Sequence, residues 1–154
     1  MTAPSCILGV DPGICGAVGI YHPSISDKVG VEDMPLAGRD VDGAALARII
    51  RRYAPDLAVI EQVSSRPGQG VASTFRFGRA YGTLIGVIAA LEIPCVFVTP
   101  SKWKRHFNLS SDKEEARAMA IRLWPASAHF ERKKDHNRAE AALIARWGAA
   151  NALP

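Results

Sequence analysis

Apolar residues in the first quarter of the chain form short runs bounded by turn residues, a pattern typical of β-strands. Residues 6–11 and 15–21 are two such runs, and the Asp-Pro-Gly at 11–13 favours a turn between them, so the two are expected to pair as a hairpin. Residues 28–34 form a weaker apolar run and predict a third strand. The chain is therefore expected to begin with three antiparallel strands.

The next segment changes to helical spacing and then returns to a strand. Apolar residues between Leu46 and Tyr53 fall on one face of a helix predicted over 41–54, which Asp40 would cap. Residues 57–61, Leu-Ala-Val-Ile-Glu, then form a short apolar strand that ends in a carboxylate. A strand, a helix and an apolar strand in succession indicate a parallel crossover.

A flexible loop is predicted at 64–70 and a long helix at 72–91. Within that helix, Gly78, Gly82 and Gly86 recur every four residues. Glycine costs about 1 kcal/mol in a helix interior, so the stripe needs a structural reason. Close packing on the sheet, or on a helix of this chain or of a second copy, would supply one.

The rest of the chain predicts one more strand and three helices. The strand covers 94–98, and the helices cover 100–107, 111–124 (opened by the capping-box pattern Ser-Asp-Lys-Glu) and 135–150. The whole order predicts a single α/β domain over 1–154. Its mixed five-stranded sheet would have three antiparallel and then two parallel strands, flanked by helices.

Composition narrows the class of protein. The chain has 154 residues, of which 48% are hydrophobic and 22% charged, as in ordinary soluble globular proteins. It lacks an apolar run of the roughly 20 residues that span a bilayer, and its first residues lack the features of a signal peptide. A cytoplasmic bacterial or phage-like setting without a membrane partner is expected. Cys6, Cys15 and Cys95 have no CxxC spacing, which predicts buried thiols rather than a zinc site or disulfides.

Positive charge is modest in amount but grouped along the chain. The net charge is +4, the pI is about 9.2, and acidic residues cluster at 27–42, away from the basic groups. This pattern predicts a basic face for an anionic ligand, usually nucleic acid, with solvated surface charge as the alternative. The residues expected to bind nucleic acid are Arg66, Arg76, Arg79, Lys102, Lys104, Arg105, Lys113, Lys133 and Lys134.

Two predicted strands end in carboxylates, Asp11 and Glu61. If these strands are neighbours, both side chains reach the carboxyl end of the sheet, where α/β proteins gather their ligands. Paired carboxylates repel each other, and a divalent cation relieves the repulsion. Hard oxygen ligands favour Mg²⁺, with Mn²⁺ as a substitute. The alternative is that each acid is a simple turn or cap residue.

A third acidic group lies in the segment 133–140, Lys-Lys-Asp-His-Asn-Arg-Ala-Glu. His136 and Glu140 are four residues apart and share a helix face. Asp135 lies at the predicted helix start, where it can cap the helix, bind a metal ion, or do both.

These motifs resemble those of the RuvC-type Holliday junction resolvases. The resemblance rests on Ile7-Leu-Gly-Val-Asp-Pro-Gly13, Val59-Ile-Glu61 and residues 135–145, and segments 70–78 and 99–104 are most similar to the phage-borne and short bacterial branch. It implies an RNase H-like fold, a symmetric dimer, and a four-way DNA junction nicked on two opposed strands. The family's acids would map onto Asp11, Glu61 and Glu140, with Asp135 or His136 as the fourth group, and its helper lysines near Lys104 and Lys113.

The chain departs from the family's pattern in two regions. Many members carry Asp where this chain has Glu140, and their fourth group lies three residues earlier, a place that Asn137 occupies here. The loop 64–70 lacks the aromatic residue that many members place near the junction centre. Phe75 either takes over that role or belongs to the core.

The resulting hypothesis is two-metal hydrolysis of a DNA phosphodiester by a metal-dependent endonuclease. Its alternatives are another RNase H-fold nuclease, acting on branched DNA or RNA–DNA hybrids, and a junction-binding protein without catalysis. A third alternative, a nucleotide-binding ATPase of the actin-like class, is disfavoured, because that class needs a second phosphate loop and about twice the length. The proposed catalytic residues are Asp11, Glu61, Asp135, Glu140, Lys113 and His136, of which the first four would be metal ligands and His136 a ligand, a proton carrier or a bystander.

Overall fold

A five-stranded mixed sheet forms the centre of the computed structural model, which describes residues 2–152. The strand order is β3-β2-β1-β6-β7, with β1 antiparallel to β2, β2 antiparallel to β3, and β6 parallel to both β1 and β7. The predicted sheet is confirmed. The strands are β1 (Ile7–Asp11), β2 (Ala17–Tyr21), β3 (Val29–Asp33), β6 (Leu57–Glu61) and β7 (Cys95–Val98).

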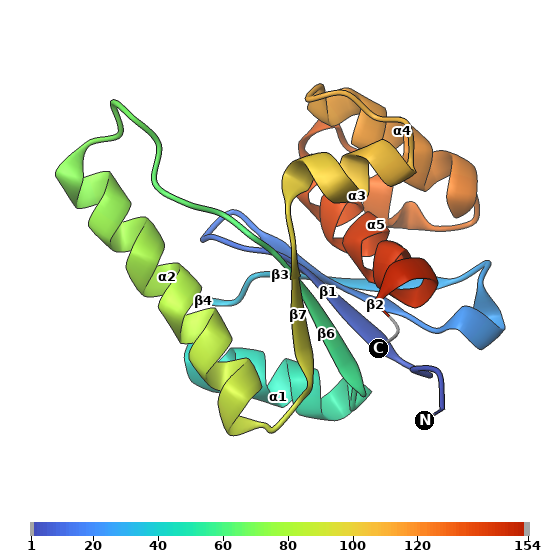
Figure 1. Cartoon of the computed structure of the whole chain (residues 1–154), viewed down its shortest axis with the longest axis horizontal. Helices are drawn as coiled ribbons and strands as arrows, with labels where there is room; N and C mark the ends of the chain where they lie inside the picture. Colours follow the sequence, from blue (N-terminus) through green and yellow to red (C-terminus); the bar gives the residue numbers. More distant parts are fainter. Residues whose placement is uncertain (1, 153–154) are drawn as a thin grey trace.

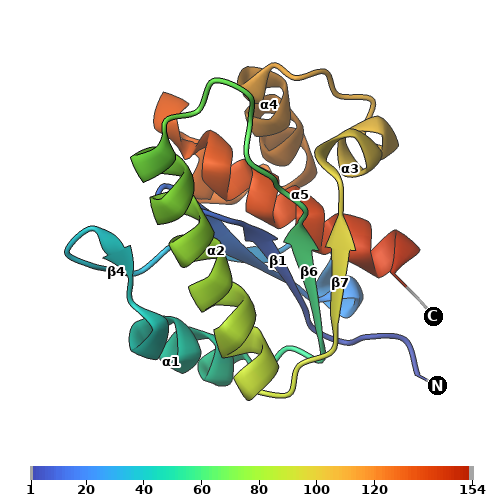
Figure 2. The same cartoon turned by 60° about the vertical axis from the view of Figure 1, so that its left-hand side comes forward.

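Helices cover the two faces of the sheet unequally (Figure 1). On one face lie α1 (Gly43–Tyr53) and the long α2 (Val71–Ala90). On the other, α5 (His136–Asn151) lies directly on the strands, with α3 (Pro100–His106) and α4 (Lys113–Leu123) beyond it. Figure 2 shows α2 in front of the sheet and α5 behind it.

Several short elements were not predicted. Strands β4 (Leu36–Ala37) and β5 (Asp40–Val41) pair as a small separate hairpin. In the described range 2–152, three 3₁₀ helices occupy Pro23–Ile25, Ala128–Phe130 and Lys133–Asp135. Runs this short carry too little periodicity to be recognised in a sequence.

Two predicted helix caps are wrong by one or two residues. Because Asp40 belongs to β5, Asp42 caps α1 instead, and its side chain accepts a hydrogen bond from Ala45 N at 2.9 Å. Helix α4 is capped by Asp112 rather than by Ser111, and the Asp112 side chain accepts from Glu114 N. In both cases another residue that suits the cap position lies close by, so the sequence pattern alone does not choose between them.

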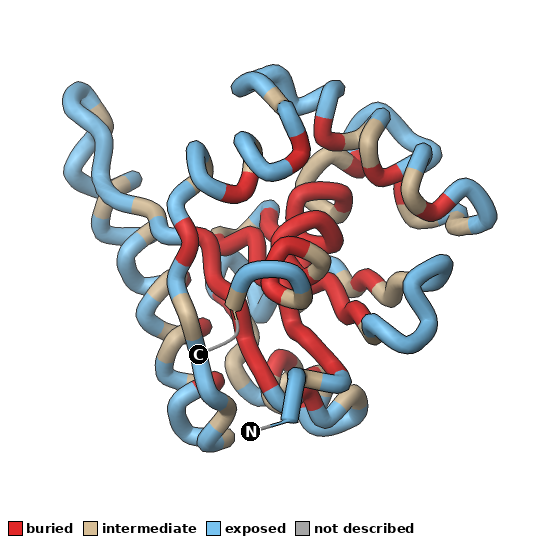
Figure 3. The backbone as a smooth tube through the Cα atoms, turned by 45° about the vertical axis from the view of Figure 1, so that its right-hand side comes forward, coloured by how far each residue is buried: buried red, intermediate tan, exposed pale blue. Residues whose placement is uncertain are grey.

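The sheet separates two hydrophobic cores, because successive side chains of a strand point to opposite faces. Leu8 and Val10 of β1 belong to the core under α1 and α2. Ile7 belongs to the core under α5. The same alternation directs Asp11 toward α5. Figure 3 shows that the central strands and α5 are the most continuously buried part of the backbone, whereas much of α2 is exposed.

Glycines allow α5 to approach the sheet closely. A Cβ atom on Gly9 of β1 would lie 2.3 Å from the carbonyl oxygen of Ala141, and one on Gly148 of α5 would lie 2.5 Å from Val59 Cγ2. Real Cβ atoms essentially never come so near other atoms, so a larger residue at either position would force its neighbours to shift. The small residues of α5 complete the fit. This close packing fixes where α5 delivers Glu140.

The glycine stripe of α2 is not used in this way. Ala80, Leu84 and Ile88 are the residues of α2 that pack on the sheet. Apart from the adjoining backbone of α2 itself, a Cβ on Gly78, Gly82 or Gly86 would meet no described atom within 4 Å. Of the alternatives considered for these glycines, packing on the chain's own sheet is therefore wrong, because they lie on the opposite side of the helix.

The cysteines are only partly as predicted. Cys6 is buried, whereas Cys15 and Cys95 are exposed, and all three are free thiols. Cys15 lies in the turn between β1 and β2, and Cys95 begins the edge strand β7, where neighbours cover a side chain less fully. Across residues 2–152, none of the helices combines the length and apolar character that crossing a membrane requires.

Candidate active site

A cavity of about 720 Å³ opens at the carboxyl ends of β1 and β6. It lies between the β1–β2 turn, the segment 62–70 that leads to α2, and the starts of α3, α4 and α5. The charged and amide side chains that line it include those of Asp11, Glu61, Glu140, Lys104, Lys113 and Asn137.

Strand register brings two of the acids together. Val10 of β1 lies beside Ile60 of β6 in the parallel pairing, so Asp11 and Glu61, one residue further on, end neighbouring strands. Both side chains point to the face covered by α5. Glu140 comes from the first turns of α5, which packs on β1. The three predicted acids thus line one cavity although they are far apart in the sequence.

Burial leaves these carboxylates short of solvation. Asp11, Glu61 and Glu140 are each 7–8% exposed. Burial, followed by the charges of Glu140 and Glu61, raises the pKa of Asp11 well above its ordinary value. Burial also raises the pKa values of Glu61 and Glu140. The site therefore holds negative charge at a cost that a bound cation would relieve.

Basic side chains offset part of this charge. Lys104 Nζ lies 4.0 Å from Glu140 Oε1. Lys104 and Lys113 both act to lower the pKa values of Asp11 and Glu140, and Arg66 does so for Glu61. All three basic residues line the cavity. An anionic ligand entering the cavity would therefore meet basic side chains as well as carboxylates.

The donor set fits a hard divalent cation in its chemistry. Three buried carboxylates supply the oxygen ligands that Mg²⁺ and Mn²⁺ prefer. Within the part of the chain that the structure describes, no three His, Cys, Asp or Glu side chains are already gathered closely enough to form a metal site. A bound ion would therefore have to draw the carboxylate side chains closer together.

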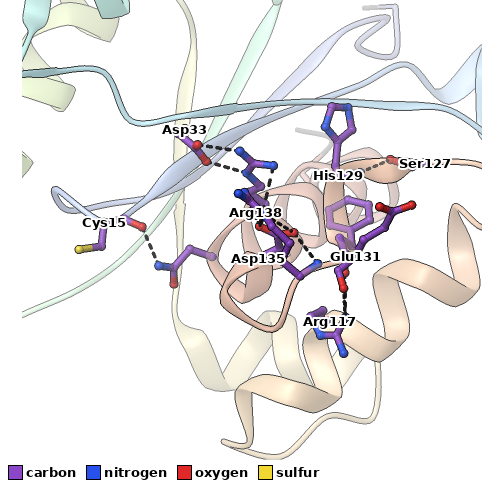
Figure 4. A network of polar contacts seen from close by, with 11 residues as sticks. Cys15, Asp33, Arg117, Ser127, His129, Glu131, Asp135 and Arg138 are labelled. Atoms are coloured by element: carbon purple, nitrogen blue, oxygen red, sulfur yellow. Dashed lines mark hydrogen bonds and ion pairs between the residues drawn. The ribbon is translucent and has the colours of Figure 1, made fainter.

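Asp135 does not join the other acids. Its carboxylate accepts hydrogen bonds from the backbone N of Arg132 at 2.8 Å and from the guanidinium of Arg132. It also lies 3.8 Å from Arg138, which Figure 4 shows beside it. Although burial alone would raise it, the bonds from Arg132 hold the pKa of Asp135 below its ordinary value. Asp135 makes no side-chain cap to α5 either. It lines a smaller neighbouring cavity of about 230 Å³ with Asp33 and Arg138.

The two residues after Asp135 behave differently from each other. His136 is partly buried and lines neither cavity. Asn137 lines both, and its Nδ2 donates to the carbonyl oxygen of Cys15 at 2.6 Å. This bond ties the start of α5, which carries Glu140, to the turn that follows Asp11. Asn137, which lies three residues before Glu140, thus lines the larger cavity, whereas His136 does not.

The predicted nucleic-acid-binding residues are divided among several surfaces. Arg66, Lys104 and Lys113 line the larger cavity, and Lys134 lines the smaller one. On α2, Arg79 is paired with Asp40. Lys102 Nζ lies 5.7 Å from the ring centre of Trp147. The remaining three, which are exposed and line neither cavity, are Arg76, Arg105 and Lys133.

Sequence reasoning missed one residue that contacts an acid directly. The indole Nε1 of Trp103 donates to Glu61 Oε2 at 2.7 Å, and Trp103 is fully buried. In the sequence, Trp103 stands between Lys102 and Lys104. The signal available was a large aromatic residue inside a basic segment, which does not reveal a contact with a residue 42 positions away.

Sequence comparison finds similar proteins in one bacterial species. No protein-family model matches the chain. Crossover junction endodeoxyribonuclease RuvC from two strains of Nitratidesulfovibrio vulgaris is 29% identical to it over 114 residues, which cover 68% of each chain.

Solved structures show the same fold at low sequence identity. Thermus thermophilus RuvC in complex with a Holliday junction substrate superposes with a TM-score of 0.70 at 17% identity, over 94% of this chain and 97% of that one. The fowlpox virus Holliday junction resolvase gives a TM-score of 0.61 at 16% identity, over 96% and 99%. The narrower likeness to the phage-borne and short bacterial branch stays a prediction. The predicted resemblance to the RuvC-type Holliday junction resolvases, with their RNase H-like fold, is confirmed both in sequence and in fold.

Proposed function

We propose that this chain is a metal-dependent endonuclease that resolves four-way DNA junctions by paired nicks, in DNA recombination and repair or in phage DNA processing. The observation that carries the proposal is the convergence of Asp11, Glu61 and Glu140, all buried, in one cavity that lysines also line. Crossover junction endodeoxyribonuclease RuvC is the relative found by sequence, and a RuvC bound to a Holliday junction shares the fold.

Asp11, Glu61 and Glu140 would hold Mg²⁺, with Mn²⁺ as a substitute. When bound, the ion would lower the pKa of a water nucleophile and offset negative charge on the leaving oxygen. Asp135 is not included in this set, because Arg132 and Arg138 already engage its carboxylate. His136 is likewise left out, because it does not line the cavity.

The lysines of the cavity would bind the phosphate that is cut. Lys104 comes from α3 and Lys113 from the first residue of α4, so they approach the carboxylates from two helices. Their ammonium groups would offset the charge that builds up on a phosphodiester under attack. Substitution of either should therefore reduce the rate of cleavage more than the affinity for DNA.

Contacts to the DNA backbone would supply most of the binding energy. Arg66 extends the basic lining into the segment that leads to α2, and Lys134 extends it into the smaller cavity. Each phosphate that such residues neutralise releases counterions, so affinity should fall steeply as the salt concentration rises.

A symmetric dimer would match a substrate with near two-fold symmetry. The side of α2 that faces away from the sheet carries Val71, 89% exposed, and Phe75, 70% exposed, followed by the open positions of Gly78, Gly82 and Gly86. An apolar surface followed by glycines allows another helix to approach closely. The exposure of Phe75 also rules out the core role considered for it. We propose that α2 of one copy packs on the same helix of a second copy.

Cleavage of defined substrates tests the proposal and its alternatives. The parent chain, Glu61→Gln and the control Glu114→Gln, which changes an exposed acid outside the cavity, would be compared on a four-way junction, a flap, a linear duplex and an RNA–DNA hybrid. We expect Mg²⁺-dependent paired nicks in the junction by the parent and the control, and binding without nicking by Glu61→Gln. Preferred cutting of the hybrid would indicate another RNase H-fold nuclease. Binding without cutting by the parent would indicate a non-catalytic junction binder.

A further inference from the structure

A buried tryptophan contacts the carboxylate cluster from the side of α3. Trp103 has no exposed surface, and its indole Nε1 donates to Glu61 Oε2 at 2.7 Å. It is part of the core under α5, where Val98 and Phe107 also lie. Packing on this scale fixes the rotamer of a large ring, so the indole N–H is held in one direction.

This hydrogen bond involves only one of the two carboxylate oxygens of Glu61. Among the described residues, Trp103 is the one that donates a hydrogen bond to this carboxylate, and the acceptor is Oε2. Within residues 2–152, every fully buried side-chain nitrogen or oxygen has a hydrogen-bond partner. Since no described side chain or backbone group donates to Oε1, this oxygen retains contact with the open cavity that Glu61 lines.

The neighbouring residue reaches a second acid. Lys104 Nζ lies 4.0 Å from Glu140 Oε1 and 5.4 Å from the ring centre of Trp103. Consecutive residues of the short helix α3 thus contact two of the three carboxylates. Trp103 offers a neutral donor, which orients Glu61 without cancelling its charge, whereas Lys104 offers a charge.

We propose that Trp103 is a positioning residue, which holds Glu61 by one carboxylate oxygen and leaves the other directed to a divalent cation. The proposal rests on the proposed function, because it assumes that Glu61 binds the ion. A carboxylate that is already oriented loses less side-chain entropy when it becomes a ligand. Partners that orient metal ligands in this way typically contribute about 10-fold to 100-fold in ion affinity.

Ion binding in the absence of DNA provides the test. Calorimetric titration with Mg²⁺ and with Mn²⁺ would compare the full-length parent, Trp103→Phe and Trp124→Phe. Trp124 is a matched control, because it is also fully buried and its Nε1 donates to a carbonyl oxygen, that of Ser26 at 3.1 Å, away from the cavity.

We expect Trp103→Phe to bind either ion about 10-fold or more weakly, and Trp124→Phe to bind like the parent. In junction cleavage, Trp103→Phe should need more Mg²⁺ for half-maximal rate but approach the parent's rate at saturating ion. Equal ion affinity for the parent and a folded Trp103→Phe would overturn the proposal. A parent chain that neither binds the ions nor cuts junctions would instead overturn the proposed function.

A second readout needs no substitution of Trp103. The indole ¹H–¹⁵N resonances of the three tryptophans can be assigned from the spectra of Trp124→Phe and Trp147→Phe. Addition of Mg²⁺ to the parent should shift the Trp103 resonance more than the other two, because only its N–H contacts a proposed ligand. If the ion binds and this resonance does not move, the proposal is wrong, whether or not Trp103→Phe folds.

Discussion

The two faces of the sheet differ in how they use glycine. On the α5 face, Gly9 and Gly148 lie where an added Cβ would collide with another element, and the helix they admit delivers Glu140. On the α2 face, Gly82 and its neighbours in the stripe point into open space. The same residue type thus serves packing within the chain on one face, and on the other leaves an open surface on which we propose that a second copy packs. The proposed metal ligands lie on the closely packed face.

The largest difference in cleavage rate is expected between substitutions of Glu140 and of Asp135, which are five residues apart. Glu140→Gln should lower the rate of junction cleavage by roughly 1,000-fold or more, because it removes a proposed metal ligand. Asp135→Asn should cleave at a rate close to that of the parent, since its carboxylate faces Arg132. Single-turnover cleavage at saturating Mg²⁺ would measure both. Loss of cleavage in a folded Asp135→Asn would show that this acid acts in the site.

Substitution by alanine should change stability in opposite directions at the glycine that contacts α5 and at those of the α2 stripe. Gly9→Ala should lower the free energy of unfolding by about 3 kcal/mol or more, because a Cβ there would lie 2.3 Å from backbone atoms of α5. Gly82→Ala should raise the stability of the isolated chain by up to about 1 kcal/mol, since alanine favours the helix and meets no clash. Urea unfolding of dilute protein would measure both. A well-tolerated Gly9→Ala would contradict the close packing of α5.

Self-association should depend on the exposed side of α2. Phe75→Asp should weaken a dimer by about 10-fold or more, because it introduces a charge into an apolar contact. Ile121→Asp, which changes a residue of α4 that is 40% exposed, is the control. Sedimentation equilibrium across a range of concentrations would report both. If the parent stays monomeric at all concentrations, or if Phe75→Asp leaves the dimer dissociation constant unchanged, α2 does not form the interface.

The smallest expected effect is on the unfolding free energy of the ion-free protein and on how that free energy depends on pH. Because the folded-state pKa of Asp11 is raised, the folded protein holds this proton more tightly than the unfolded chain, and its stability falls as pH rises above the ordinary carboxyl range. Asp11→Asn should therefore stabilise the ion-free protein at neutral pH by roughly 1 kcal/mol. Asp135 has a lowered pKa, so its contribution is present near neutral pH and is lost on acidification. Thermal unfolding with a chelator from pH 4 to pH 8 would test both signs.

The positions of Asp11 and Glu61 could be predicted because they depend on local rules. Each ends an apolar run, and parallel neighbours end at the same edge of a sheet. Glu140 followed from helical spacing and from family resemblance. The role of Asp135 could not be predicted, because its contacts to Arg132 arise from a 3₁₀ turn that the sequence pattern does not indicate.

The glycines show why periodicity alone is not enough. A repeat of four identifies one side of the α2 helix but does not say whether that side meets the sheet. That depends on which neighbouring residues are the more apolar, and here Ala80, Leu84 and Ile88 take the sheet side. The strand glycine that α5 requires has no periodic pattern, and the hydrogen bond between Trp103 and Glu61 spans 42 residues. Both depend on the assembled fold.

Asp11, Glu61 and Glu140 are proposed to share a divalent cation, and anomalous scattering from crystals grown with Mn²⁺ would locate that ion. We expect a strong anomalous peak in the larger cavity, within about 2.5 Å of carboxylate oxygens from all three residues. A peak beside Asp135 and Arg138 instead, or none in the larger cavity at a saturating Mn²⁺ concentration, would contradict it.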